Sequence, residues 1–202
     1  MYELLNIDLI SIVKTAGLLG LFFIIFAESG LFFGFFLPGD SLLFTAGLLA
    51  SQGFLNIYFL IILMFLGATL GDTVGYWFGV KVGPKIFNRE NSFLFNKKHI
   101  ERTQNFYQKY GTKTIILARF IPIVRTFAPI LAGVGGMKYS LFLRYNIVGG
   151  ALWGIGITLL GFGLGNAVPN IDKYIISIVI IIIATSFIPI VIEFLKNEKL
   201  NE

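Results

Sequence analysis

Long apolar runs dominate the chain, and few ionisable residues interrupt them. Three runs are each long enough to be a membrane-spanning helix and cover residues 54–80, 139–165 and 174–192. The only charged residues within them are Asp72 and Arg144. A helix needs about 20 apolar residues to cross the hydrocarbon core of a bilayer. We therefore predict three full crossings and an all-α, polytopic membrane protein.

The composition agrees with this pattern and removes several kinds of chemistry. The chain of 202 residues is 56% hydrophobic and 13% charged, whereas about 25% of the residues of a soluble domain are charged. Because the chain contains no cysteine, disulfides, thiolate metal sites and a catalytic thiol are excluded. The single histidine, His99, lies in a polar stretch. We expect no metal site, no cofactor and no enzymatic activity.

Positive charge is concentrated in one connecting stretch. Residues 81–113 contain eight of the 16 lysines and arginines, against two glutamates. Because cytoplasmic loops of membrane proteins are rich in Lys and Arg, we expect this loop to be cytoplasmic, together with the C-terminus. Residues 97–110 have the pattern of a basic amphipathic helix on the membrane surface. The basic residues adjoin membrane segments, so we predict no nucleic-acid partner.

Residues 114–137 have the features of a hairpin that enters the membrane and turns back. The segment follows Lys113 and precedes Lys138, which places both of its ends on the cytoplasmic side. Pro122, Pro129 and three glycines near the end of the segment supply the helix breaks that a hairpin requires.

The first half of the chain repeats this plan. Pro38 precedes Gly47 in a context similar to that in which Pro122 precedes Gly133. Glycines also recur at a constant offset of 82, in the pairs 67 and 149, 79 and 161, and 83 and 165. One crossing separates the two units, so equivalent pieces face opposite sides of the membrane.

We therefore predict a single membrane domain, residues 1–202, built from two inverted repeats over residues 15–83 and 98–165. Each repeat is a re-entrant broken-helix hairpin followed by a transmembrane helix. Residues 174–192 add a C-terminal transmembrane helix. Inverted repeats with interrupted helices are typical of transporters, whose sites lie where the breaks meet.

Ionisable residues in apolar surroundings identify a candidate site. There are five of them: Glu28, Asp40, Asp72, Arg119 and Arg125. A charge at the centre of a bilayer costs about 2.5–3.5 kcal/mol on insertion scales. Each of these side chains therefore needs a partner, water or a substrate.

The two arginines favour an anion. Their guanidinium groups stay charged and match the oxygens of a phosphate, so we predict that Arg119 and Arg125 bind a phosphate head group. Glu28 and Asp40 are predicted to take up and release protons. Four further residues are expected to support the site: Pro38, Gly39, Asp72 and Pro122.

A helix N-terminus is predicted beside these charges. Pro38 is a break, and either Asp40 or Ser41 would be a good N-cap for a helix that begins at Leu42. The N-terminus of such a half-helix presents backbone N–H groups and positive potential, which suit an anion.

Structural explanations of the same residues stay open. Glu28 could form an ion pair that only locks the two repeats together, and Asp40 could be only an N-cap. Asp72 could be a hydrogen-bonding group in helix packing. Trp77 and Trp153 are given no role beyond packing or interfacial anchoring.

In their order along the chain, these motifs resemble those of the DedA family, bacterial members of the group with a VTT or SNARE-associated Golgi domain. The motifs are Phe26-Ala-Glu28, Phe36-Leu-Pro-Gly-Asp40-Ser, Gly71-Asp72, and Arg119-Phe-Ile-Pro122 followed by Arg125. The resemblance covers roughly residues 15–165. It implies two re-entrant hairpins, two essential carboxylates at Glu28 and Asp40, and two essential arginines at Arg119 and Arg125.

The resemblance also implies a substrate class. Family members are linked to proton-dependent transport, and some translocate undecaprenyl phosphate or phospholipids. We expect a multi-pass protein of the bacterial cell membrane that is a proton-coupled lipid translocase. A homo-oligomer is compatible with the sequence but not required by it. The alternative is a proton-coupled transporter of a small solute or ion. An enzyme such as a lipid phosphatase lacks a nucleophile, and a scaffold would leave the five buried charges unexplained.

Overall fold

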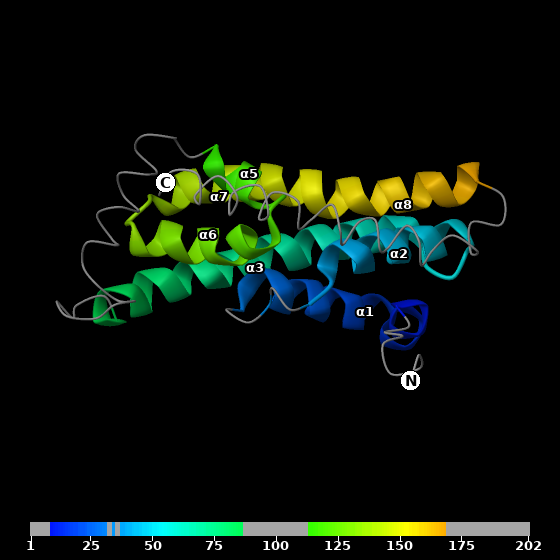
Figure 1. The fold of residues 1–202 in the computed structure, drawn as a ribbon, viewed down its shortest axis with the longest axis horizontal. Coiled ribbons are helices and arrows are strands. Elements are labelled where there is room, and N and C mark those ends of the chain that lie inside the picture. Colours follow the sequence, from blue (N-terminus) through cyan, green and yellow to red (C-terminus); the bar gives the residue numbers. More distant parts are fainter. Residues whose placement is uncertain (1–8, 32–33, 35–36, 87–112, 169–202) are drawn as a thin grey trace, which may run out of the picture.

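The computed structural model describes residues 9–31, 34, 37–86 and 113–168, and all regular structure within them is helical (Figure 1). The elements are α1 (Leu9–Gly30), α2 (Gly39–Ser51), α3 (Ile57–Ile86), α5 (Thr114–Ala118), α6 (Pro122–Val134), α7 (Tyr139–Gly150), the π-helix η2 (Ala151–Ile155) and α8 (Gly156–Ala167). The surface helix predicted over 97–110 and the crossing predicted over 174–192 lie outside the described residues.

Long apolar helices form the frame of the molecule. Within the described residues, three stretches are long and apolar enough to cross a membrane: Ile12–Gly30, Ile57–Gly83 and Tyr139–Ala167. The last of these is continuous, since α7, η2 and α8 follow one another without a break. The sequence prediction of helices over 54–80 and 139–165 is confirmed. The predicted loop from residue 81 begins later, because α3 continues through Lys81 to its end.

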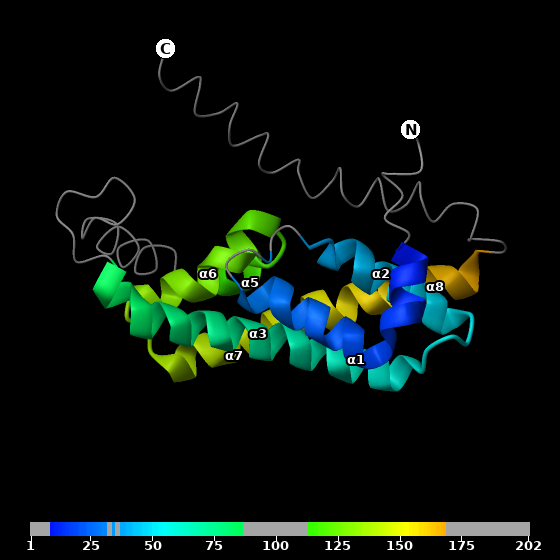
Figure 2. The ribbon, with the colours of Figure 1, turned by 90° about the horizontal axis from the view of Figure 1, so that it is seen from below.

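Short helices occupy the two ends of this frame. α2 packs along α8 at one end of the molecule, and α6 packs along α3 towards the other (Figures 1 and 2). Pro38 stands immediately before α2, and Pro122 is the first residue of α6. Both positions suit proline, because the first turn of a helix has backbone N–H groups without intrahelical partners. Pro129, in contrast, lies inside α6 without ending it, so the break predicted there is wrong.

The first helix has a kink of its own. Gly17 adopts a φ of 59° within α1, a left-handed conformation that favours glycine. The part of α1 after this kink packs against α3. At Gly30 the two helices are so close that a Cβ atom would lie 2.7 Å from the carbonyl oxygen of Gly71. Close approach of this kind is how small residues stabilise helix pairs in a bilayer.

Two helix–helix contacts lined by glycine, which we call the paired glycine crossings, have the same arrangement of residues. Where α2 crosses α8, a Cβ on Gly47 would overlap the carbonyl oxygen of Thr158, and one on Gly161 would overlap that of Phe44. Where α6 crosses α3, the corresponding overlaps join Gly133 to Tyr76 and Gly79 to Ile130. The α6 positions lie 86 residues after their α2 counterparts, and the α8 positions lie 82 residues after their α3 counterparts. Each short helix therefore packs on the long helix of the other half of the chain.

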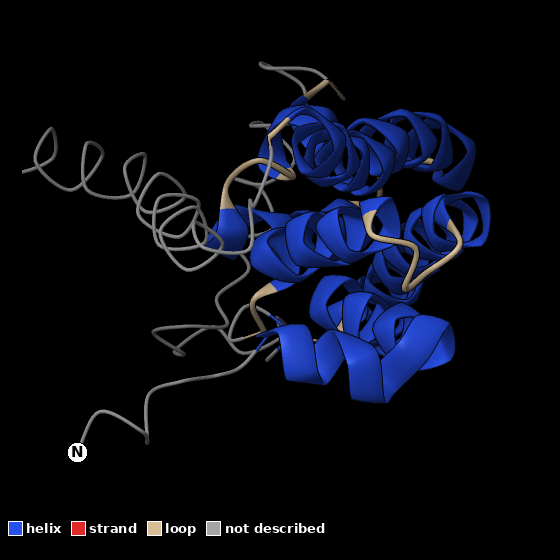
Figure 3. Ribbon diagram, turned by 90° about the vertical axis from the view of Figure 1, so that its right-hand side faces the viewer, coloured by secondary structure: helices blue, strands red, loops and turns tan. Residues whose placement is uncertain are grey.

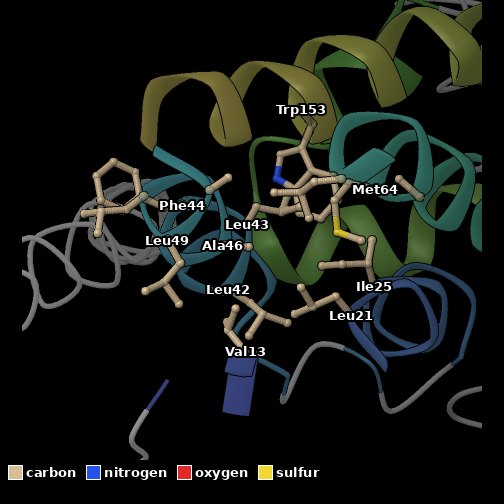
Figure 4. Packing of buried hydrophobic residues seen from close by; sticks show 14 residues of the cluster. Val13, Leu21, Ile25, Leu42, Leu43, Phe44, Ala46, Leu49, Met64 and Trp153 are labelled. Atoms are coloured by element: carbon tan, nitrogen blue, oxygen red, sulfur yellow. The ribbon is translucent and has the colours of Figure 1, made fainter. Parts of the chain in front are cut away.

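Apolar side chains fill the space between the helices and also cover much of the outside. A large cluster joins α1, α2, α3 and η2, and includes Leu21, Leu43, Met64 and Trp153 (Figure 4). Many large apolar side chains on α1, α3 and α8 nevertheless face outwards, and Leu160 is 63% exposed. Figure 3 shows the helical bundle. The exposed apolar side chains on its outside suit contact with lipid tails.

Candidate functional site

Arg125 on α6 joins two carboxylates that come from different parts of the first half of the chain. Its Nη2 donates to Oε1 of Glu28, at the end of α1, and its Nη1 lies 2.8 Å from Oδ1 of Asp40, in the first turn of α2. Arg125 is only 3% exposed and Glu28 is fully buried, whereas Asp40 is 19% exposed. The fork of a guanidinium is suited to two such acceptors at once.

Trp153 on η2 completes this group of residues, which we call the Arg125 cluster. The indole Nε1 donates to Oδ1 of Asp40 over 2.6 Å, the same oxygen that accepts from Arg125. The Cζ atom of Arg125 also lies 4.3 Å from the centre of the tryptophan ring, a distance typical of a cation–π contact. Trp153 is completely buried. Trp153 thus makes polar contacts in the site, which the expectation of packing or interfacial anchoring did not include.

The N-terminus of α2 is also part of the Arg125 cluster. The helix begins at Gly39, and its N-cap is Pro38, so the predicted start at Leu42 and the predicted N-cap at Asp40 or Ser41 are wrong. The backbone N–H of Gly39 donates over 3.2 Å to Oε1 of Glu28. The anion at this helix end is thus the carboxylate of Glu28. A Cβ on Gly39 would overlap this carboxylate, so a larger residue here would displace Glu28 from its partners.

Arg119 lies in a second group, which we call the Arg119 cluster. Its Nη2 donates to Oδ2 of Asp72 on α3 and over 2.5 Å to Oδ1 of Asn146 on α7. The amide of Asn146 donates in turn to the carbonyl oxygen of Thr69 over 3.0 Å. Arg119, Asp72 and Asn146 are at most 1% exposed. Arg119, which directly follows α5, therefore bridges the two long helices through a buried ion pair to Asp72 on α3 and a hydrogen bond to Asn146 on α7.

The two clusters act on each other electrostatically. Arg119 interacts with the charges of Arg125 and Glu28, and Asp72 interacts with that of Arg125. Three carboxylates and two guanidinium groups give this set one excess negative charge when all are ionised. Several buried polar atoms have no hydrogen-bond partner within the described residues, and they include Nε and Nη1 of Arg119, Nε of Arg125, Oε2 of Glu28 and Oδ1 of Asp72.

The sequence located the charged residues but not their pairing. The structure brings Glu28, Asp40 and Arg125 together, and it places Arg119 and Asp72 in the neighbouring cluster. Sequence reasoning missed Asn146 and Trp153. For Asn146 the available signal was a polar amide inside an otherwise apolar run. The described residues bring together no group of three His, Cys, Asp or Glu side chains that could hold a metal ion.

The fold and the buried clusters define a polytopic helical membrane protein with interacting charges between its helices. A family model for the VTT domain matches residues 37–163. The chain is 44% identical over 181 residues to "Protein DedA" of Escherichia coli (strain K12), an alignment that covers 89% of this chain and 82% of that protein. The chain belongs to the DedA family of VTT-domain membrane proteins.

Two further relatives extend the comparison. An uncharacterized membrane protein of Mycobacterium leprae (strain TN) is 46% identical over 169 residues, which are 84% of this chain and 75% of the relative. The "Inner membrane protein YqjA" of Escherichia coli (strain K12) is 36% identical over 155 residues, or 76% of this chain and 70% of the relative. No solved structure matches the chain.

Proposed function

We propose that the protein is a translocase that moves the phosphate-bearing head group of a lipid across the bacterial cell membrane, together with a proton. The substrate class is undecaprenyl phosphate or a phospholipid, and the lipid leaves chemically unchanged. The observation that carries the proposal is Arg125, a permanently charged side chain held between two carboxylates with only 3% exposure.

A phosphate can replace the carboxylates around Arg125. Phosphate and carboxylate oxygens offer the same bidentate geometry to a guanidinium. Arg125 therefore has two states, one bound to Glu28 and Asp40 and one bound to the head group. Arg119 supports the second state, because its Nε and Nη1 have no partner within the described residues and remain available to an anion.

The charge balance of the clusters supports coupling to protons. An incoming phosphate adds negative charge to a buried set that already carries one excess negative charge. Neutralising a carboxylate offsets this charge and also frees a donor of Arg125. Of its two carboxylate partners, Glu28 is fully buried and its Oε2 has no hydrogen-bond partner within the described residues, whereas Asp40 is 19% exposed. We therefore assign the proton to Glu28 and propose that Asp40 provides the path by which the proton reaches it.

The paired crossings support alternating access by two inverted repeats. We propose that α1 with α2, and α5 with α6, are re-entrant hairpins that open to opposite sides. The contacts of Gly47 and Gly161 on one side correspond to those of Gly133 and Gly79 on the other. Two equivalent interfaces on either side of one charged site would let the same residues face each side in turn.

The relatives and the charge pattern support a location and an orientation for the chain in the membrane. YqjA is named an inner membrane protein, and we propose the same location for this chain. Eight basic residues between positions 81 and 113 favour a cytoplasmic location for that connection, and we propose the same side for the C-terminus. The partners are the bilayer, the lipid substrate and possible further copies of the chain.

The test is head-group translocation in proteoliposomes. Undecaprenyl phosphate and a labelled phospholipid are compared with and without a pH gradient for wild type and for Arg125→Lys, which keeps the charge but loses the fork. We expect transport of at least one lipid by wild type, faster with the gradient, and at least a tenfold loss in Arg125→Lys.

Arg144→Lys is the matched control, since Arg144 is exposed and lies outside both clusters. It should transport at the wild-type rate. Unimpaired transport by folded Arg125→Lys would refute the proposed role of Arg125. Movement of free inorganic phosphate, with neither lipid translocated, would replace the proposal with a small-solute transporter.

A further inference from the structure

We propose that Trp153 is a positioning residue that lets Arg125 exchange Asp40 for the phosphate group of the substrate, because its indole N–H holds the Asp40 carboxylate when the guanidinium leaves. The inference rests on the proposed function, in which Arg125 binds the phosphate. The inference adds an uncharged residue to the proposed phosphate site.

The geometry that points to this role is one shared oxygen. Oδ1 of Asp40 accepts from Nη1 of Arg125 over 2.8 Å and from Nε1 of Trp153 over 2.6 Å. The two donors come from different halves of the second repeat, α6 and η2. When Arg125 turns to a phosphate, Asp40 therefore keeps a hydrogen bond from a helix that need not move with α6.

The energetic reason is the cost of taking its cation away from the Asp40 carboxylate. Removing one partner of a buried ion pair is far more costly than the pair is worth, and a remaining hydrogen bond to the charged group offsets part of that cost. The ring of Trp153 also lies over Arg125, with 4.3 Å between Cζ and the ring centre. This contact guides the guanidinium along an aromatic face while its hydrogen bonds change partners.

The backbone around Trp153 fixes its direction. Residues 151–155 form a π-helix, a local irregularity that often occurs at functional sites. It packs against α3 at close range, because a Cβ on Gly150 would lie 2.7 Å from Oγ1 of Thr69 and one on Gly154 would lie 3.4 Å from the carbonyl oxygen of Met64. The backbone that carries the indole is therefore packed against α3, apart from α2 and α6.

The test is a double-mutant cycle on binding of short-chain phosphatidic acid, with the diacylglycerol of the same chain length as the uncharged control and inorganic phosphate as the lipid-free arm. Trp153→Phe keeps a ring over Arg125 but removes the N–H. We expect it to weaken phosphatidic acid binding about tenfold. In the Asp40→Asn background no carboxylate is left behind at this position, so the same substitution should change binding less than twofold.

An equal loss in both backgrounds would show that Trp153 acts only through packing, and it would overturn the inference while leaving the proposed function intact. Failure of phosphatidic acid and of inorganic phosphate to bind the folded wild type would overturn both. If inorganic phosphate binds as well, its binding should show the same dependence on Trp153 and Asp40.

A second measurement does not depend on the folding of Trp153→Phe. The chain has two tryptophans, so ¹⁵N-labelled tryptophan gives two indole signals, and Trp77→Phe assigns them. We expect the Trp153 signal to shift on addition of phosphatidic acid but not of diacylglycerol, and its N–H to stay protected from exchange. Saturating phosphatidic acid that leaves this signal unchanged would contradict the inference.

Discussion

Nη1 of Arg125 lies 2.8 Å from Oδ1 of Asp40, and this contact joins α6 to the first turn of α2 across 85 residues of sequence. Each residue lies two or three positions after a proline at a helix start, Pro38 before α2 and Pro122 at the start of α6. The ion pair therefore connects the tips of two helices that belong to different halves of the molecule. If Arg125 changed its ion-pair partner, contacts in both halves of the molecule would therefore change.

The Arg119 cluster should be separable into a part that stabilises the fold and a part that binds substrate. Arg119→Ala leaves Asp72 buried without its cation, and we expect a loss of about 3–5 kcal/mol in the free energy of unfolding. Combining Arg119→Met with Asp72→Leu removes both charges and should recover most of that loss. The measurement is denaturant unfolding in detergent micelles.

Binding of phosphatidic acid distinguishes a role of Arg119 in stability from a role in substrate binding. The stable double variant still lacks the Arg119 donors, so it should bind phosphatidic acid at least tenfold more weakly than wild type. Wild-type binding by this variant would mean that Arg119 serves only the fold. Equal stability of Arg119→Ala and the double variant would contradict the buried ion pair itself.

Gly39 should tolerate no side chain. An alanine Cβ would overlap the carboxylate of Glu28 and push it away from Arg125. We expect Gly39→Ala to cost about 1–3 kcal/mol of unfolding free energy and to reduce head-group transport. Gly163→Ala is the control, because no heavy atom lies within 4 Å of its Cβ position, and its effect should stay within about 0.5 kcal/mol. Similar stabilities of the two variants would rule out the steric argument.

The paired glycine crossings predict paired effects. Alanine at Gly47 would meet the carbonyl oxygen of Thr158, and alanine at Gly133 would meet that of Tyr76. We expect each substitution to lower the free energy of unfolding by about 1–3 kcal/mol, with values similar to each other. Thermal unfolding in the same detergent checks this. Tolerance of one substitution beside a large loss from the other would argue against equivalent repeats.

Much of the frame could be predicted because its signals are local. Apolar runs of membrane length identified α3 and the helix over α7 and α8, and Pro38 and Pro122 identified where the short helices start. The exact start of α2 was not predictable, since Asp40 and Ser41 both resemble N-caps. The helix starts earlier, with Pro38 as its N-cap. There the backbone N–H of Gly39 donates to the carboxylate of Glu28, eleven residues before it.

Only the charged residues of the site could be predicted from the sequence. Charged residues in an apolar run must find partners, which singled out the five ionisable residues. Asn146 and Trp153 carry no charge, and their importance depends on which helix faces meet. Trp153 contacts Asp40 across 113 residues, and it points there from a π-helix for which the sequence has no periodic signal. Such contacts are set by tertiary packing rather than by any local pattern.

The central claim is that Arg125 leaves its carboxylates to hold a lipid phosphate, and a direct atomic measurement tests it. Solid-state NMR of the protein in bilayers would record the dipolar coupling between ¹⁵N-labelled arginine side chains and the ³¹P nucleus of undecaprenyl phosphate or phosphatidic acid. The account predicts a coupling that is present in wild type and in Arg144→Lys and is strongly reduced in Arg125→Lys, where only Arg119 remains near the phosphate. A coupling that persists unchanged in folded Arg125→Lys, or its absence from wild type with bound lipid, would contradict the account.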